Sequence, residues 1–501
     1  MGETQREMLI SHETSETRVA LLEDGGLVEL YVERPKRSVA GNVYLGKVKD
    51  VLPGMQAAFV DIGLDKNAFL YIDEIVAARR AHPGQRGDIS SFVSPGDQVL
   101  VQVQRDPMGT KGARVTTDIT LPGRFTVLMP FSDTVGVSRK LPDEERERLH
   151  LLIESALPEG IGGIVRTVAQ GASDKDIAAD LEFLLRLWKR VSHQAEEALA
   201  PEIVYAEMDL SLRLVRDVFS DGFKRLVIDD KATYAKVVSF LKKTSPQLVK
   251  RVVYHRDRVT SLFNAYRLGP TIDSALQRVV ELPSGGYIAI DRTEALTAID
   301  VNSGRYVGRK NLEDTILRIN LEAAEEVARQ LRLRDIGGII VIDFIDMAEA
   351  ASRSAVMKRF SAALERDRTK TRVLEMSRLG LVEMTRKNVT DGLFGVLTEV
   401  CPRCDGQGRV LSSVSRRIAV ERRLRDILRE SKSSALLFAV HPEVYELLTA
   451  PGANVIGALK SETRKQVEIV AEPDCRPLEI RVLIEGRAGL FKQGLGSFMR
   501  R

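Results

Sequence analysis

Between Arg278 and Val400, short β-branched segments alternate with long amphipathic ones, and this alternation limits the possible folds more than any other feature of the sequence. The segments GGYIAIDRTEALTAIDV and GGIIVIDFID predict strands, whereas residues near 312–333 and 351–366 predict helices. Strands and helices that alternate in this way form layered α/β domains. Since 501 residues exceed what one hydrophobic core can serve, we expect three or more domains, and this α/β unit is one of them.

The region from Gly41 to about residue 120 has a different sequence pattern. Short β runs are separated there by Pro-Gly and other glycine-containing turns. Five short strands over about 80 residues predict a small closed barrel of the OB type.

Helices and strands are expected to alternate after this barrel. Pro142, followed by acidic residues, predicts the start of a helix, and a long amphipathic helix is expected from 174 to 198. The β-branched run 161–169 predicts a strand that carries Arg166 and Thr167. The tail, 413–501, is expected to form a small α/β unit.

Composition narrows the class of protein. No run of about twenty apolar residues is present and the N-terminus is polar, so we expect neither a membrane span nor a secretory signal. Two of only three cysteines fall in one CxxC, which argues against a disulfide framework and favours a soluble protein of the reducing cytoplasm. A net charge of +4 does not by itself indicate a nucleic-acid partner.

Two acidic residues in predicted strands are candidate metal ligands. Asp300 shares one strand face with Asn302, and Asp343 interrupts a run that otherwise predicts a buried strand. A carboxylate is costly to bury unless a cation or hydrogen-bond donors compensate it, and magnesium prefers such hard oxygen ligands. The alternative is that these residues cap strand ends or pair with arginine. Asp346 has the opposite parity from Asp343, and we do not assign it as a ligand.

The motif CPRC supplies half of a tetrahedral zinc site. Cys401 and Cys404 have the required spacing, and a second copy of the chain would complete the site across a two-fold axis. A redox pair would need Cys401 at a helix N-terminus, which Gly406 and Gly408 make improbable. Two unconnected thiols are the remaining alternative.

The predicted barrel also offers candidate RNA contacts. Aromatic side chains on short strands can stack on bases, and lysines can follow the phosphates. Packing in the barrel core is the alternative for the aromatic residues. The candidates are Phe59, Phe69, Tyr71, Lys47, Lys49 and Lys111.

Taken together, AIDVNSGR, IDFIDM and CPRCDGQG, with AAFVDIG, KGARVTT and the Val-Arg-Thr segment, resemble the catalytic core of the ribonuclease E/G family over about 1–415. This resemblance implies an endoribonuclease that hydrolyses single-stranded, AU-rich RNA in rRNA processing and mRNA turnover, leaving a 5′-phosphate and a 3′-hydroxyl. It implies catalytic magnesium on Asp300 and Asp343, with Asn302 as the orienting amide. It also implies zinc shared through Cys401 and Cys404 between the subunits of a dimer or tetramer.

The same resemblance implies two further sites. RNA-channel contacts fall on Phe59, Phe69 and Lys111. A pocket for a 5′-monophosphate falls on Gly123, Val127, Arg166, Thr167 and Lys370. From the residues alone, Arg166 with Thr167 suits a terminal phosphate, although a surface ion pair is the alternative. The family's pocket can include a further arginine where this chain has Lys370, which keeps the charge without the planar fork.

The implied architecture is a multidomain α/β protein in which an RNase H-like domain carries an inserted OB-fold barrel and a 5′-sensor region, followed by a DNase I-like catalytic domain. The short stretch after the core favours the compact members of the family over those with a long disordered scaffold. A non-cleaving RNA-binding or chaperone protein and a DNA nuclease are the competing functions. The expected domains are 1–37 and 215–278 (RNase H-like), 38–122 (OB-fold), 123–214 (5′-sensor), 279–400 (catalytic), 401–412 (zinc-link knuckle) and 413–501 (small C-terminal domain).

Overall fold

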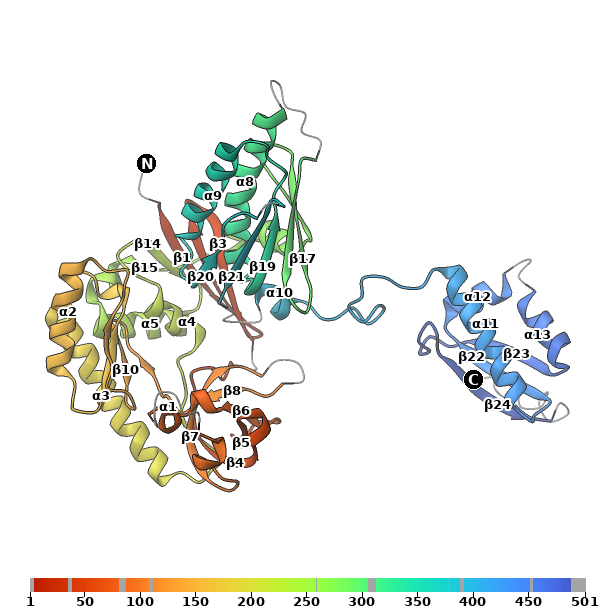
Figure 1. The fold of residues 1–501 in the computed structure, drawn as a ribbon, viewed down its shortest axis with the longest axis horizontal. Helices are drawn as coiled ribbons and strands as arrows, with labels where there is room; N and C mark the ends of the chain where they lie inside the picture. The colour runs from red at the N-terminus through yellow and green to blue at the C-terminus, as the bar shows by residue number, and fades with distance from the viewer. Residues whose placement is uncertain are drawn as a thin grey trace. The chain divides into compact units, whose positions relative to one another are not determined.

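The computed structural model describes residues 4–34, 38–80, 87–107, 111–257, 259–304, 312–377, 379–387, 392–450 and 454–487. The chain divides into two compact units, Met1–Thr398 and Glu399–Arg501, and each is a mixed α/β structure (Figure 1). Among the helices described, none has both the length and the apolar character that a membrane crossing requires.

A five-stranded sheet brings the N-terminal strands together with strands from much later in the chain. Its order is β15-β14-β1-β2-β3, so β3 lies at one edge, and β1 pairs in parallel with β14. Buried apolar residues of β1 and β2 pack against α4 and α5 on one face. The elements are β1 (Arg6–His12), β2 (Thr17–Glu23), β3 (Gly26–Glu33), β14 (Phe223–Ile228), β15 (Val252–Tyr254), α4 (Leu210–Asp217) and α5 (Lys231–Thr244).

The predicted five-stranded barrel is confirmed. Its strands follow the order β4-β5-β6-β8-β7, and a pairing between β4 and β7 closes it. A Cβ at Gly46 would lie 2.6 Å from Val60 Cγ1, so β4 needs glycine where it crosses the tight barrel interior. The strands are β4 (Val43–Leu52), β5 (Ala57–Asp61), β6 (Ala68–Tyr71), β7 (Gln98–Arg105) and β8 (Arg114–Thr116), and β13 (Glu202–Tyr205) adds to β4.

A four-stranded sheet with two helices follows the barrel. Both predicted helices are confirmed as α2 (Asp143–Ala156) and α3 (Asp174–Glu197). The predicted strand over 161–169 is wrong beyond Val165, because the backbone turns into a short 3-10 segment over Thr167–Ala169, closed by the bond from the Ala169 amide to the Arg166 carbonyl at 3.0 Å. The strands are β9 (Leu121–Pro122), β10 (Thr126–Met129), β11 (Val135–Val137) and β12 (Gly162–Val165).

A six-stranded sheet completes the first unit. Its order is β16-β17-β18-β19-β21-β20, and α8 and α9 cover one face (Figure 1). The other face carries the residues that alternate with the buried ones. The elements are β16 (Val279–Glu281), β17 (Tyr287–Arg292), β18 (Thr297–Asn302), α8 (Leu312–Leu333), β19 (Gly338–Asp343), α9 (Ala350–Leu364), β20 (Thr371–Val373), β21 (Leu381–Arg386) and α10 (Gly392–Leu397).

The second unit contains the small α/β structure expected for the tail. Strand β22 is buried along its whole length, as its sequence ALLFAV requires of a central strand in the order β23-β22-β24. The elements are α11 (Ser413–Glu430), β22 (Ala435–Val440), α12 (Pro442–Thr449), α13 (Val455–Thr463), β23 (Gln466–Ala471) and β24 (Ile480–Gly486).

Candidate functional site

The candidate metal ligands lie side by side on the open face of the six-stranded sheet. Strands β18 and β19 pair in parallel, and Asp300 is the direct register partner of Asp343. Ile299 and Val301 point into the core beneath α8, so the period-two alternation of a strand turns Asp300 to the opposite face. Strand pairing alone therefore brings the two carboxylates to one place.

The amide of Asn302 is engaged with one of these carboxylates. Its Nδ2 donates a hydrogen bond to Asp300 Oδ2 at 2.7 Å. The expectation that the acids are buried is wrong: Asp300 and Asp343 are both exposed, because only the other face of the sheet is covered by helices. Even so, partial desolvation raises the pKa of Asp343, and the carboxylates of Asp300 and Asp346 raise it further.

This arrangement fits a divalent cation with few protein ligands. Two carboxylates that repel each other are stabilised by a cation between them, and magnesium is commonly held by one or two carboxylates with water and phosphate in its other positions. Over the described residues, no group of three or more His, Cys, Asp or Glu side chains forms a metal site. Among the described residues, the site thus offers a cation the two carboxylates of Asp300 and Asp343.

The alternative, pairing with arginine, is found at the neighbouring acid instead. Arg278 forms two hydrogen bonds of 2.5 and 2.6 Å with Asp291, which lies on the same open face. Within the ranges that the structure describes, neither Asp300 nor Asp343 forms an ion pair with a basic residue.

On the barrel, the structure brings Phe59 and Phe69 together. They are register partners on β5 and β6, with ring centroids 6.0 Å apart and an interplanar angle of 68°. Both are half-buried and alternate with the buried core residues, so they do not pack in the barrel core. Lys111 is exposed, whereas Lys49 is paired with Asp61 at 3.2 Å.

The candidate phosphate pocket is brought together in part. Arg166 donates to the Gly123 carbonyl at 2.9 Å and to Asp217 at 2.6 Å, so its guanidinium is already in a half-buried ion pair. The hydroxyl of Thr167 lies 2.6 Å from that of Ser138. Val127 lies on β10, the strand that pairs with β12 just before Arg166. Lys370 is exposed next to β20, and no contact joins it to the other four residues in the described part of the chain.

Cys401 and Cys404 lie in a series of turns rather than at the start of a helix. The Cys404 amide donates to the Cys401 carbonyl at 3.3 Å, and Gly406 and Gly408 both have positive φ. Hydrogen bonds from the amides of Arg403 and Cys404, with a further one from the Cys404 thiol, lower the pKa of Cys401. The exposed Cys401, with its lowered pKa, suits a zinc ion, whereas Cys475 is buried, which raises its pKa.

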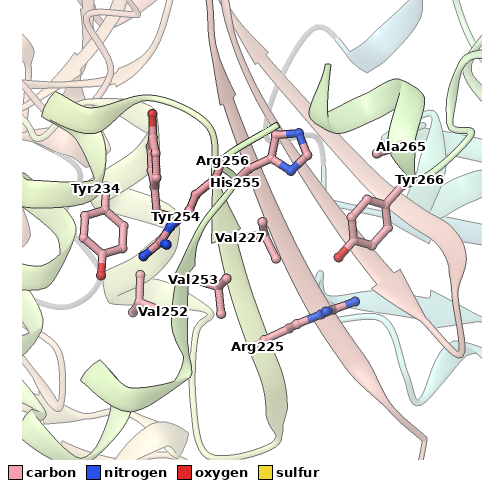
Figure 2. Close-up of a pocket in the computed structure, with 10 residues that line it drawn as sticks. All are labelled: Arg225, Val227, Tyr234, Val252, Val253, Tyr254, His255, Arg256, Ala265 and Tyr266. Atoms are coloured by element: carbon pink, nitrogen blue, oxygen red, sulfur yellow. The ribbon is translucent and has the colours of Figure 1, made fainter. Parts of the chain in front are cut away.

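A pocket of about 880 Å³, which the sequence analysis did not predict, lies beside the five-stranded sheet. Figure 2 shows Tyr254 and Arg256 on one side of an apolar floor and Tyr266 with Arg225 on the other. Arg225 is paired with Glu7 at 2.7 Å. The residues that line this pocket come from four separate elements, which is why no local sequence pattern could predict the pocket. None of the predicted site residues line it.

Comparison with known proteins gives a consistent result. Residues 120–389 match the family model described as the Ribonuclease E/G family. Ribonuclease G of Salmonella typhimurium (strain SL1344) is 40% identical over 475 residues, which cover 93% of this chain and 97% of that protein. Ribonuclease G of Haemophilus influenzae is 43% identical over 412 residues (81% and 84%), and ribonuclease E of the same organism is 35% identical over 478 residues (94% and 51%).

Proposed function

Because this chain belongs to the ribonuclease E/G family and is an endoribonuclease, we propose that it hydrolyses single-stranded, AU-rich RNA with a magnesium ion held by Asp300 and Asp343. The observation that carries the proposal is the register of two parallel strands, which sets the two carboxylates opposite each other. Water attacks the phosphorus, the bond from phosphorus to the 3′-oxygen breaks, and that oxygen takes up a proton, which gives products with a 5′-phosphate and a 3′-hydroxyl. Ribosomal RNA processing and mRNA turnover are the proposed roles of this ribonuclease G-like chain.

Different residues of this chain hold the metal ion, orient its ligand and bind the RNA. When bound, magnesium supplies an activated water and neutralises charge on the phosphate. Asp300 and Asp343 hold the ion, and Asn302 keeps the Asp300 carboxylate in one orientation through its hydrogen bond. The half-exposed rings of Phe59 and Phe69 stack on bases, and Lys111 follows the backbone phosphates.

Three finer proposals accompany the main one. Gly123, Val127, Arg166, Thr167 and Lys370 recognise a 5′-monophosphate. Zinc held by Cys401 and Cys404 of two subunits links a dimer or tetramer in the cytoplasm. The five-stranded sheet is the RNase H-like domain and the six-stranded sheet the DNase I-like domain, with the boundaries given by the sequence.

Cleavage of an AU-rich oligoribonucleotide, with magnesium and with EDTA, tests the main proposal. We expect Asp300→Asn and Asp343→Asn to abolish magnesium-dependent cleavage while RNA affinity, measured by fluorescence anisotropy, stays near that of the wild type. Asp291→Asn is the matched control, because Asp291 is a carboxylate on the same sheet face that is paired with Arg278. Wild-type rates in both Asp300 and Asp343 variants would refute the assignment, and equal cleavage of a matched DNA would refute the substrate class.

A further inference from the structure

A buried ionic cluster centred on Glu29 joins the five-stranded sheet to the region of the six-stranded sheet. Glu29 lies on the edge strand β3 and is 6% exposed. Its carboxylate accepts hydrogen bonds from the Tyr31 hydroxyl at 2.7 Å, from Arg332 at 2.9 Å and from Arg368. The two arginines are 303 and 339 positions away in sequence, so the cluster fixes a contact between distant parts of the chain.

Neighbouring residues stabilise the contact between β3 and α8 further. Arg332, near the end of α8, also pairs with Glu23 at 2.9 Å. Beside the cluster, Leu333 of α8 packs in the same apolar core as Leu27 and Leu30 of the sheet. Breaking a buried ionic cluster is strongly destabilising, because it leaves a buried charge without its partner. We therefore expect the side chains of this cluster to keep their positions.

Arg368 belongs to the chain segment 367–370, which ends at Lys370. The neighbouring Asp367 is buried against Arg386 at 2.8 Å, and Arg386 also donates to the Thr369 hydroxyl at 3.1 Å. The Lys370 carbonyl accepts from the amide of Lys387 at 3.0 Å. The backbone of 367–370 is therefore held from within its own sheet and, through Arg368, from the five-stranded sheet.

The same five-stranded sheet supports Arg166. The guanidinium of Arg166 is bonded to Asp217, the last residue of α4. Leu214 and Val215 of α4 lie in the buried core formed with β1 and β2. The five-stranded sheet thus positions both Asp217, which binds Arg166, and Glu29, which binds the segment that contains Lys370.

We propose that Glu29 is a positioning residue for recognition of the RNA 5′ end, and that the five-stranded sheet is the frame that sets Lys370 relative to Arg166. This inference rests on the proposed 5′-monophosphate pocket. Glu29 does not touch the phosphate in this scheme. It holds Arg368, and Arg368 holds the segment from which Lys370 projects.

The test compares cleavage of one oligoribonucleotide with a 5′-monophosphate or a 5′-hydroxyl, in magnesium. We expect Glu29→Gln and Arg368→Gln to raise KM for the phosphorylated substrate by about tenfold, the effect of one charge-assisted hydrogen bond. Cleavage of the 5′-hydroxyl substrate, and kcat for both substrates, stay at wild-type values. Lys370→Gln gives a similar loss, and combining it with Arg368→Gln adds nothing further, because both changes remove the same interaction.

Glu7→Gln is the matched control. Glu7 lies on β1 of the same sheet and accepts a hydrogen bond from Arg225 at 2.7 Å, but it does not reach the 367–370 segment. Arg368→Gln is the milder variant, since the Arg368 side chain is 42% exposed, and it decides the question if Glu29→Gln does not fold. A wild type without any 5′-phosphate preference overturns the pocket and this inference with it. A preference that survives in the variants, or an equal loss on both substrates, overturns the role of Glu29 alone.

Discussion

At the scale of single residues, Asn302 shows how one amide can set the geometry of a proposed ligand. It donates to Asp300 at 2.7 Å from two positions further along β18. We expect Asn302→Ala to lower magnesium-dependent cleavage by about 10- to 100-fold, the range for residues that orient a metal ligand. Magnesium titration of the cleavage rate measures the effect, with the exposed neighbour Ser303→Ala as control. An unchanged titration curve would show that the amide is not needed.

The paired rings of the barrel allow a second residue-scale prediction. Phe59→Ala and Phe69→Ala are each expected to weaken RNA binding by about 1–3 kcal/mol, the contribution of stacking on one base. Binding is measured by anisotropy without magnesium, so that cleavage does not intervene. Phe131→Ala is the control, since Phe131 also forms an edge-to-face pair, with Trp188 at 5.3 Å, outside the barrel. Equal losses at all three positions would point to folding rather than to stacking.

At the scale of elements, Asp180 ties α3 to the loop that precedes β10. Its buried carboxylate accepts hydrogen bonds from the amides of Arg124, Phe125 and Thr126 at 2.9–3.0 Å. Asp180→Ala leaves these donors without a partner, each costing about 1–3 kcal/mol, so α3 should unfold from this region at lower urea. The chain's one tryptophan, Trp188, lies on α3 and reports that transition by fluorescence. Glu182→Ala, an exposed site on the same helix, should shift the midpoint little.

The contact between β3 and α8 predicts a dependence of stability on pH. Burial opposes ionisation of Glu29, but Arg368 and Arg332 outweigh it, and the pKa of Glu29 falls below its ordinary value of 4.5. A lowered pKa in the folded state means that the stabilisation is complete above pH 4.5 and is lost as the pH falls further. The difference in melting temperature between wild type and Glu29→Gln should therefore be large at pH 7 and shrink below pH 4.5. A difference independent of pH would show that Glu29 is not ionised.

Elements with a strong local pattern could be predicted from the sequence, and contacts between distant segments could not. The amphipathic pattern over 22 residues predicted where α8 begins and ends. The alternation in β18 predicted the face of the sheet on which Asp300 projects. The run 161–169 misled because β-branched residues continue past Val165, while strand pairing with β10 ends at Arg166 and the chain then turns. The exposure of Asp343 was missed since sequence alone does not tell which face of a sheet lacks a helix. The Glu29 cluster depends on three segments meeting, and no local pattern encodes that.

At the scale of the whole molecule, the proposed zinc link predicts a dependence of assembly on metal. The double change Cys401→Ser with Cys404→Ser should remove bound zinc and lower the mass measured by light scattering, because two sulfurs from each subunit complete the tetrahedral site. Cys475→Ala is the control, since Cys475 is buried and should not alter zinc content. Zinc-free wild-type protein, or an unchanged mass in the double variant, would rule out the link.

The parallel register of β18 and β19 has a consequence for how this chain tolerates insertions and deletions. Ladder partners keep a common face only while both strands keep their residue count. Removing one residue within β19 ahead of Asp343 would rotate that carboxylate beneath α8, into the place now taken by Ile342, and put Phe344 opposite Asp300. Point substitutions can adjust a centre built in this way, but a single-codon deletion in β19 dismantles it while leaving every acidic residue in the protein.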